Sequence, residues 1–322
     1  EYGGGSIIHN NGMKLPEQWQ QFWNDADLEP ANDGVKLAIN LGKGFQTLVR
    51  VVQNLDSTDM TGKPKGTYEV TAILKLECLD VDANGVMTLK QEPNEIQLST
   101  VDLNGKRTSY NDKTDGPVPD DFWPHYIWWG ATYYAKLRPD STIVGARFDA
   151  PINTPANAQI SREPNWIMAD SPESRERAAT QLLHLRGILL PLPNQEFLKG
   201  QPVKIEHNFS GDNPRQVEEL WIVRDVNGST AEIELTQTTK HDYSIPEPDP
   251  KHRAKTGVKC TTKASIDLET GLVSAAIRQF ETKIRLFEIT GDDSERKPLS
   301  DSAGRGTETW QIIESEPGAG SS

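Results

Sequence analysis

Long runs of alternating apolar and polar residues constrain this chain most, because that pattern suits a β-strand with one buried face. The clearest run covers residues 67–79, in which every second residue from Tyr68 to Leu76 is apolar. Asn-Gly dipeptides at 84–85, 104–105 and 227–228 lie between or beside such runs, and Asn-Gly is a strong signal for a tight hairpin turn. The sequence therefore predicts a mainly β protein built from antiparallel hairpins.

One stretch, residues 171–199, has the pattern of a helix, at residues 172–187, followed by a proline-rich exit. Ser171 and Pro172 suit the first positions of a helix, and Pro191 and Pro193 stop it. Between them, apolar residues spaced by three and four form one stripe. A helix cannot bury such a stripe alone, so we expect it to link two parts of the chain and to pack on a sheet.

The segments on either side of this linking helix repeat one pattern. Residues 76–96 and 220–240 each hold a strand, a turn with Asp-Val and Asn-Gly, and a second alternating strand. We therefore expect two related, curved antiparallel sheet halves, half-barrel-like, at residues 35–170 and 200–314. The first half is expected to open with a hairpin of residues 35–41 and 45–55.

The two ends of the chain differ from the β halves in composition. Residues 1–34 predict an N-terminal arm and a short amphipathic helix, and residues 315–322 a flexible tail. Trp19 and Trp23 lie at helical spacing, and either plug the end of a sheet or bind a partner. Because the chain begins with Glu1, a cleaved secretory signal is an expectation.

Composition bounds the partners. The chain has 322 residues, of which 35% are apolar, and a net charge of −13. Binding to nucleic acid needs clustered Lys and Arg, so we expect no nucleic acid. The same charge disfavours an anionic membrane surface. No apolar run approaches the ~20 residues of a spanning helix, so no membrane span is expected.

The two cysteines, Cys78 and Cys260, lie in comparable strands of the two halves. Either they form a disulfide in an oxidising compartment, or both are inert buried thiols.

The aromatic run of residues 122–137 is the most unusual local feature. The simpler interpretation is that these aromatic residues pack in the core where a loop enters the sheet. The alternative is an apolar or sugar-facing surface, or a subunit contact. Together with Trp19 and Trp23, its candidate ligand- or partner-binding residues are Trp123, Tyr126, Trp128 and Trp129.

The sequence contains only weak motifs for catalysis or metal binding. Residues 80–85 copy the first half of a calcium loop, but its twelfth position is Gln91, which has no carboxylate, so a turn is the better interpretation. We therefore predict no catalytic residues, no metal and no cofactor.

Several segments resemble a group of uncharacterised secreted bacterial β-rich proteins. They are LPLPNQEFLKGQPVKI (190–205), the turns DVDANG (80–85) and DVNGS (225–229), and the hairpin IDLETGLV (266–273). The resemblance spans roughly residues 35–290. It implies a large antiparallel sheet curved around a helix, similar to the lipoprotein-carrier folds of the bacterial envelope, and it implies no reaction.

Together these features predict a non-enzymatic extracellular, periplasmic or cell-envelope protein. It would act as a structural subunit or partner-docking module, with protein partners or as a homo-oligomer. The alternative is a carrier that holds a lipid-like or other apolar ligand between sheet and helix. A glycan-active enzyme is the third hypothesis, because a pair of catalytic carboxylates needs no sequence proximity.

Overall fold

The computed structural model describes residues 34–58, 64–149, 151, 166–170, 192, 196–209, 215–244, 252–290 and 295–316. Three predicted segments lie outside the described residues: the N-terminal arm with Trp19 and Trp23, residues 171–191 of the linking helix, and the tail from residue 317.

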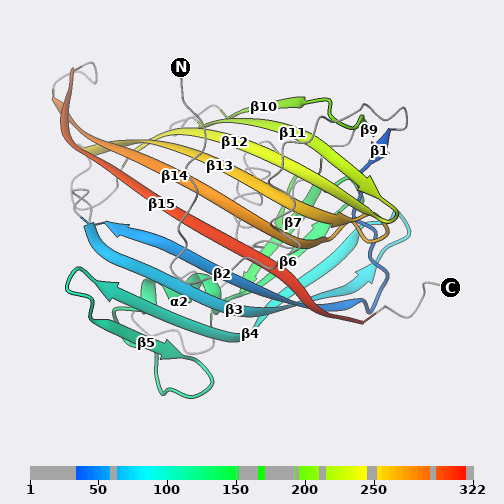
Figure 1. Cartoon of the computed structure of the whole chain (residues 1–322), viewed down its shortest axis with the longest axis horizontal. Helices are drawn as coiled ribbons and strands as arrows, with labels where there is room; N and C mark the ends of the chain where they lie inside the picture. Colours follow the sequence, from blue (N-terminus) through cyan, green and yellow to red (C-terminus); the bar gives the residue numbers. More distant parts are fainter. Residues whose placement is uncertain are drawn as a thin grey trace.

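One open sheet of 13 strands dominates the described chain, and all of its pairings are antiparallel (Figure 1). This confirms the prediction of a mainly β, antiparallel protein. In sheet order, the strands are β10 (Val203–Phe209), β11 (Arg215–Asn227), β12 (Thr230–Ser244), β13 (His252–Asp267), β14 (Val273–Thr290), β15 (Glu295–Glu316), β2 (Gln46–Thr58), β3 (Pro64–Val81), β4 (Met87–Asp102), β6 (Thr132–Leu137), β7 (Ile143–Asp149) and β8 (Ile167–Met168), while β5 (Arg107–Asn111) pairs with β4.

The sheet consists of two consecutive blocks of the chain, β2 to β8 and β10 to β15, which are joined edge to edge. Strand β15, at the end of the chain, pairs with β2, near its beginning, and Trp310 lies opposite Val51. Hydrogen bonds between β2 and β15, the last strand of the described chain, therefore hold the two blocks together. A small second sheet pairs β1 (Val35–Lys36) with β9 (Glu196–Phe197).

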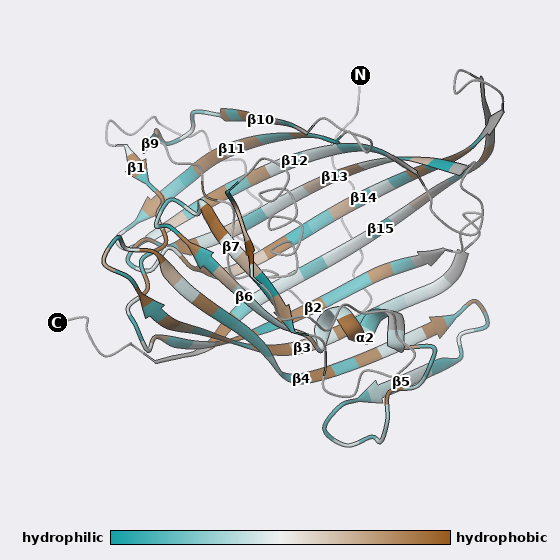
Figure 2. Cartoon of the chain, turned by 180° about the vertical axis from the view of Figure 1, so that it is seen from behind, coloured by the Kyte–Doolittle hydropathy of each residue, from teal (hydrophilic) through white to brown (hydrophobic). Residues whose placement is uncertain are grey.

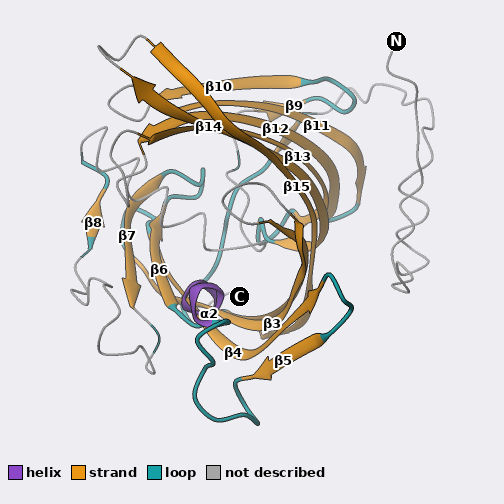
Figure 3. Ribbon diagram, turned by 90° about the vertical axis from the view of Figure 1, so that its left-hand side faces the viewer, coloured by secondary structure: helices purple, strands orange, loops and turns teal. Residues whose placement is uncertain are grey.

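The sheet bends strongly without closing. The β6–β7 turn and the β13–β14 turn lie six strand positions apart in the sheet. Two neighbouring residues of the chain nevertheless hydrogen-bond to them, one to each turn. The amide of Ile39 donates to the Pro139 carbonyl at 2.7 Å, and the amide of Asn40 donates to the Thr270 carbonyl at 2.9 Å. Figure 3 shows the resulting bend, with β6 and β7 facing β11 to β13 across the interior.

The expected hairpin of residues 35–41 and 45–55 is wrong. β1 pairs with β9, and β2 pairs with β15 and β3. Residues 37–41 instead cross one end of the bent sheet, where Leu37, Ile39 and Leu41 are at most 3% exposed. Their alternation suits a strand, but the buried face is used to plug the core.

Apolar and polar residues alternate along the long strands (Figure 2). The sheet therefore has one apolar face, which holds the buried core and which we call the inner face, and one polar outer face. Side chains of both blocks meet in one core cluster on the inner face. Tight turns keep the register: Asp82 Oδ1 accepts from the amides of Asn84 and Val86 at 2.8 and 2.9 Å. The calcium-like segment is thus a hairpin turn between β3 and β4.

A Lys-Gly turn beside a β-bulge occurs in the first block. The bulge in β3 follows Cys78, whose carbonyl accepts the amide of Gly44 at 2.8 Å. The preceding residue, Lys43, reaches Asp80 just beyond the bulge at 2.9 Å.

The second block repeats this arrangement atom for atom. The bulge in β11 follows Val223, whose carbonyl accepts the amide of Gly200 at 2.8 Å. Lys199 reaches Asp225 just beyond the bulge at 2.7 Å. The matching segments are therefore CLDVD at 78–82 and VRDVN at 223–227, one residue out of step with the alignment expected above.

Candidate functional site

The aromatic run contains the only helix among the described residues, α2 (Trp123–Trp129), followed by β6. The structure places the four predicted site residues of this run differently. Tyr126 and Trp129 are buried, at 7% and 5% exposure, and Trp123 is half-buried against the core. Only Trp128 presents a large surface, at 46% exposure.

Aromatic contacts fix α2 against the inner face. Tyr110 packs edge-on against Tyr126, with ring centroids 5.8 Å apart, and the Tyr133 hydroxyl donates to the Trp128 carbonyl at 3.0 Å. Burial, with a smaller effect of Asp112, raises the pKa of Tyr126 to about 12. Three of the four predicted site residues thus pack against the core, and Trp128 is the exposed one.

His125 covers the ring of Tyr68. No pattern in the sequence predicted this contact. Their rings stack with centroids 3.9 Å apart. The residue keeps an exposed surface, and the partial burial of its ring lowers the pKa of His125.

Register divides the inner face into three parallel rows of side chains across the strands. The deep row is apolar and at most 3% exposed. It runs through Ala72, Val51, Trp310, Ala276, Ala264, Ile233 and Val223.

The middle row is polar at its centre. Gln53, Glu308, Arg278 and Thr262 lie opposite one another on β2, β15, β14 and β13. Gln53 Nε2 donates to Glu308 Oε2 at 2.7 Å, and Arg278 Nη1 lies 3.8 Å from Glu308 Oε1. The guanidinium also donates to Thr262 at 3.3 Å and lies 4.9 Å from the centroid of the Trp310 ring.

This cluster leaves two buried polar atoms of β15 without a hydrogen bond. In the described part of the chain, neither Glu308 Oε1 nor Trp310 Nε1 has a hydrogen-bonding partner. The carboxylate is an acceptor and the indole N–H is a donor, and both side chains lie on one face two residues apart. Unsatisfied buried groups are uncommon in folded proteins and need a physical reason.

The rim row is more open. It runs through Tyr68, Leu55, Gly306, Phe280, Cys260, Gln237 and Glu219. Leu55 and Phe280 are half-buried, and both lean over Gly306, where a Cβ would collide with their side chains. Glycine therefore makes room for two apolar side chains beside the polar cluster.

The far end of the rim row is also polar and satisfied. Glu219 is 4% exposed and accepts from Trp221 Nε1 at 3.0 Å and from Gln237 Nε2 at 2.9 Å. The inner face thus combines a buried apolar floor with two polar clusters near its open side.

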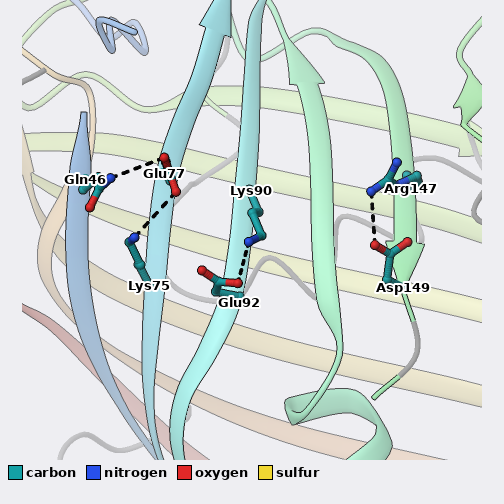
Figure 4. A network of polar contacts seen from close by, with 7 residues as sticks. All are labelled: Gln46, Lys75, Glu77, Lys90, Glu92, Arg147 and Asp149. Atoms are coloured by element: carbon teal, nitrogen blue, oxygen red, sulfur yellow. Dashed lines mark hydrogen bonds and ion pairs between the residues drawn. The ribbon is translucent and has the colours of Figure 1, made fainter. Parts of the chain in front are cut away.

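On the outer face of β3 and β4, neighbouring side chains of opposite charge neutralise each other. Lys75 and Glu77 on β3 lie opposite Glu92 and Lys90 on β4, so that each charge faces its opposite (Figure 4). The pairs along each strand measure 3.6 Å for Lys75–Glu77 and 2.5 Å for Lys90–Glu92. This arrangement is that of a solvated sheet face and needs no ligand.

Two carboxylates, Asp225 and Glu232, lie directly opposite each other on the outer face of β11 and β12. The ion pair with Lys199 lowers the pKa of Asp225. Burial raises the pKa of Glu232 to about 7, although the Ser265 hydroxyl donates to it at 2.8 Å. Opposed shifts of this kind occur at catalytic sites, but also in structural networks.

The cysteines are not bonded to each other. Cys78 on β3 and Cys260 on β13 are both free and buried. Their strands lie four positions apart in the sheet, about 19 Å along it, far beyond the Cα separation of a disulfide. Of the two alternatives, buried thiols are therefore correct and the pairing is wrong.

The described residues contain no metal-ligand cluster and no membrane-spanning helix. These residues contain no group of three His, Cys, Asp or Glu side chains placed to hold a metal ion. None of their helices has the length and apolarity to cross a bilayer. No protein-family model and no curated protein matches this sequence.

Proposed function

We propose that this chain is a non-enzymatic binding protein that carries an apolar ligand with one hydroxyl-like end on the inner face of its sheet. The observation that supports this proposal best is the pair of unsatisfied buried atoms, Glu308 Oε1 and Trp310 Nε1. One hydroxyl group both donates and accepts, which complements the acceptor Glu308 Oε1 and the donor Trp310 Nε1.

The surroundings of this pair favour an amphiphile. Leu55 and Phe280 supply half-buried apolar surface immediately beside the cluster. Arg278 keeps 29% of its side chain exposed, while Glu308 balances its charge. A ligand would therefore place its apolar part along the rim row and its polar end at the middle row. The linking helix is its cover in this proposal.

A second mode of binding, docking of a protein partner, is supported by Trp128. This side chain is 46% exposed, and its backbone is held by Tyr133. A rigidly mounted, exposed Trp suits an interface anchor. The secreted or envelope location, and a role as a subunit, are proposals that go with this mode.

We also infer that the two blocks are related halves of one duplicated unit. The Lys-Gly turn, the bulge and the Lys–Asp ion pair recur with matching hydrogen bonds at Lys43 and Lys199. A curved sheet made from two such halves offers one continuous inner face for a ligand.

The carrier proposal is tested with an apolar probe that fluoresces on binding, such as N-phenyl-naphthylamine. Phe280→Ala should weaken probe binding, because the ring belongs to the rim row. Phe287→Ala is the matched control, since it alters a half-buried phenylalanine on the outer face of the same strand. Equal binding by wild type and both variants would contradict the carrier.

The polar end is tested by competition. Decanol should displace the probe better than its methyl ether, which cannot donate to Glu308. Trp310→Phe should weaken displacement by both compounds and keep the preference, because the alcohol and the ether oxygen both accept from the indole N–H that it removes. Equal displacement by both compounds would overturn the hydroxyl assignment, and native mass spectrometry of protein from its source would identify the bound ligand.

A further inference from the structure

Four lysines surround one glycine on the outer face of β12, β13 and β14. Gly257 lies opposite Lys240 on β12 and Lys283 on β14. Lys255 and Lys259 are its neighbours two residues away on β13, on the same face. All four lysines are exposed, and a Cβ at Gly257 would meet nothing within 4 Å.

We call these four lysines around Gly257 the lysine cross. The acidic groups near it pair mainly with arginines. Asp242 pairs with Arg253 at 3.0 Å and lies 3.9 Å from Lys255. Glu281, which faces Lys259 across the strands, pairs with Arg305 at 3.3 Å.

Asp301 pairs with Arg285, which lies opposite Lys255. Within the described residues, Lys240, Lys259 and Lys283 consequently have no ion pair. Five cationic and two acidic side chains occupy the three-by-three grid of strand positions centred on Gly257, which gives the grid a net charge of +3 in a chain of −13.

Such a grid is unfavourable by itself. Strands lie about 4.8 Å apart, so Lys240 and Lys283 are about 10 Å from each other at their Cα atoms, with only glycine between them. On the other block, Lys75 lies opposite Glu92 and Glu77 lies opposite Lys90, so these charges compensate each other. The lysine cross lacks that compensation, and a bound anion would provide it.

We propose that the lysine cross docks this protein onto an anionic lipid surface by binding phosphate headgroups. The whole-chain charge disfavours such a surface, but it also orients the molecule, because the acidic surface is repelled while this basic face is attracted. The proposal does not depend on the carrier function, although the inner face of the same strands carries Phe280 and Arg278.

Two features favour a lipid surface over nucleic acid. The basic face is lysine-rich, which suits mobile phosphate headgroups, whereas single-stranded nucleic acid needs an aromatic stacking platform. Apolar groups lie at the end of the same face: Lys255 Nζ is 5.8 Å from the Phe287 ring centroid, and Leu299 is 46% exposed. Basic charge combined with exposed apolar groups is the usual composition of a peripheral membrane contact.

The test is co-sedimentation of the full chain with vesicles of phosphatidylcholine and phosphatidylglycerol in equal parts, at low salt. Wild type should bind these vesicles, and pure phosphatidylcholine should not retain it. Added salt should release it, because the Debye length shortens. Gly257→Glu should abolish binding by placing a carboxylate at the centre of the cross, and Gly257→Gln should retain it.

A second comparison separates the patch from the total charge. Lys240, Lys259 and Lys283 changed together to Gln should weaken partitioning by about a hundredfold. The same change at Lys36, Lys106 and Lys113 lowers the net charge equally at other exposed positions and should have little effect.

Circular dichroism melts establish that each variant is folded. Equal losses in both triple variants, retained binding by Gly257→Glu, or no binding by wild type would overturn the proposal. So would displacement of the protein from vesicles by a DNA oligomer or by millimolar inorganic phosphate, because the ligand would then be nucleic acid or free phosphate.

Discussion

Gln53 donates a 2.7 Å hydrogen bond to Glu308, which lies 255 residues later in the chain. The bond joins β2 to β15 on the inner face, where the two blocks of the sheet meet. Glu308 is only 3% exposed and also pairs with Arg278. One carboxylate therefore binds a neighbour on each side of the seam between the beginning and the end of the chain.

Glu308→Gln should destabilise the fold by about 1–3 kcal/mol, because it leaves the Arg278 guanidinium without a carboxylate in a largely buried site. Urea unfolding followed by circular dichroism measures the loss. Glu281→Gln, on the exposed outer face of β14, is the control and should change stability little. Equal midpoints for Glu308→Gln and wild type would show that the seam does not depend on this charge.

Glu232 should make stability depend on pH near neutrality. Its pKa is raised to about 7 in the folded state, from 4.5 in the unfolded chain. The folded state therefore holds the proton more tightly, and this contribution to stability is complete below pH 4.5 and is lost as the pH rises through about 7.

Glu232→Gln removes the titration. Because Glu232 is partly solvated, the variant should be more stable than wild type by about 1 kcal/mol at alkaline pH and should match it near pH 4. Glu234→Gln, which instead breaks the ion pair with Arg224, should give no alkaline gain. A constant difference between Glu232→Gln and wild type across the pH range would disprove the shift.

Local signals predicted most of the strands and turns. Alternation and Asn-Gly pairs depend only on neighbouring residues, so the β3–β4, β4–β5 and β11–β12 hairpins could be located from the sequence. Residues 37–41 were misassigned because a plug and a strand need the same alternation. Pairing of β15 with β2 is a contact between distant segments, and no local pattern contains it.

The candidate sites were less predictable. Trp128 differs from Trp129 only in the side of α2 on which it lies, and composition treats them alike. Glu308 and Gln53 look like ordinary polar residues until register places them face to face. The lysine cross was equally hidden, since its members come from three strands and only Lys255 and Lys259 are close in sequence.

Trp129→Ala should destabilise by about 3–5 kcal/mol, because it empties a core position that is 5% exposed. Trp128→Ala changes the same kind of side chain at the neighbouring position and should leave the melt nearly unchanged. If Trp128 anchors a partner, its loss should instead weaken assembly in size-exclusion chromatography. A large loss of stability in Trp128→Ala would show that this residue belongs to the core.

Both cysteines should resist thiol reagents in the native protein. Burial raises the pKa of Cys78 to about 11 and also raises that of Cys260, so little thiolate forms near neutral pH. Ellman's reagent should detect two thiols only after denaturation. Intact mass without reductant gives an independent count, and a chain two hydrogens lighter, with no thiol released, would contradict the free pair.

Gly271 should tolerate substitution less than Gly228, although both have a positive φ, of 72° and 59°. Alanine at either position strains the left-handed backbone by about 1–2 kcal/mol. At Gly271 the new Cβ would also collide with the Ala38 carbonyl, whereas nothing lies within 4 Å at Gly228. Gly271→Ala should therefore cost about 1–3 kcal/mol more than Gly228→Ala in urea unfolding.

The collision would push residues 37–41 away from the β13–β14 turn. Hydrogen exchange of the Asn40 amide, which donates to Thr270, should then accelerate in Gly271→Ala alone. Equal stabilities, with an unchanged Asn40 amide, would mean that the plug does not rest on this turn.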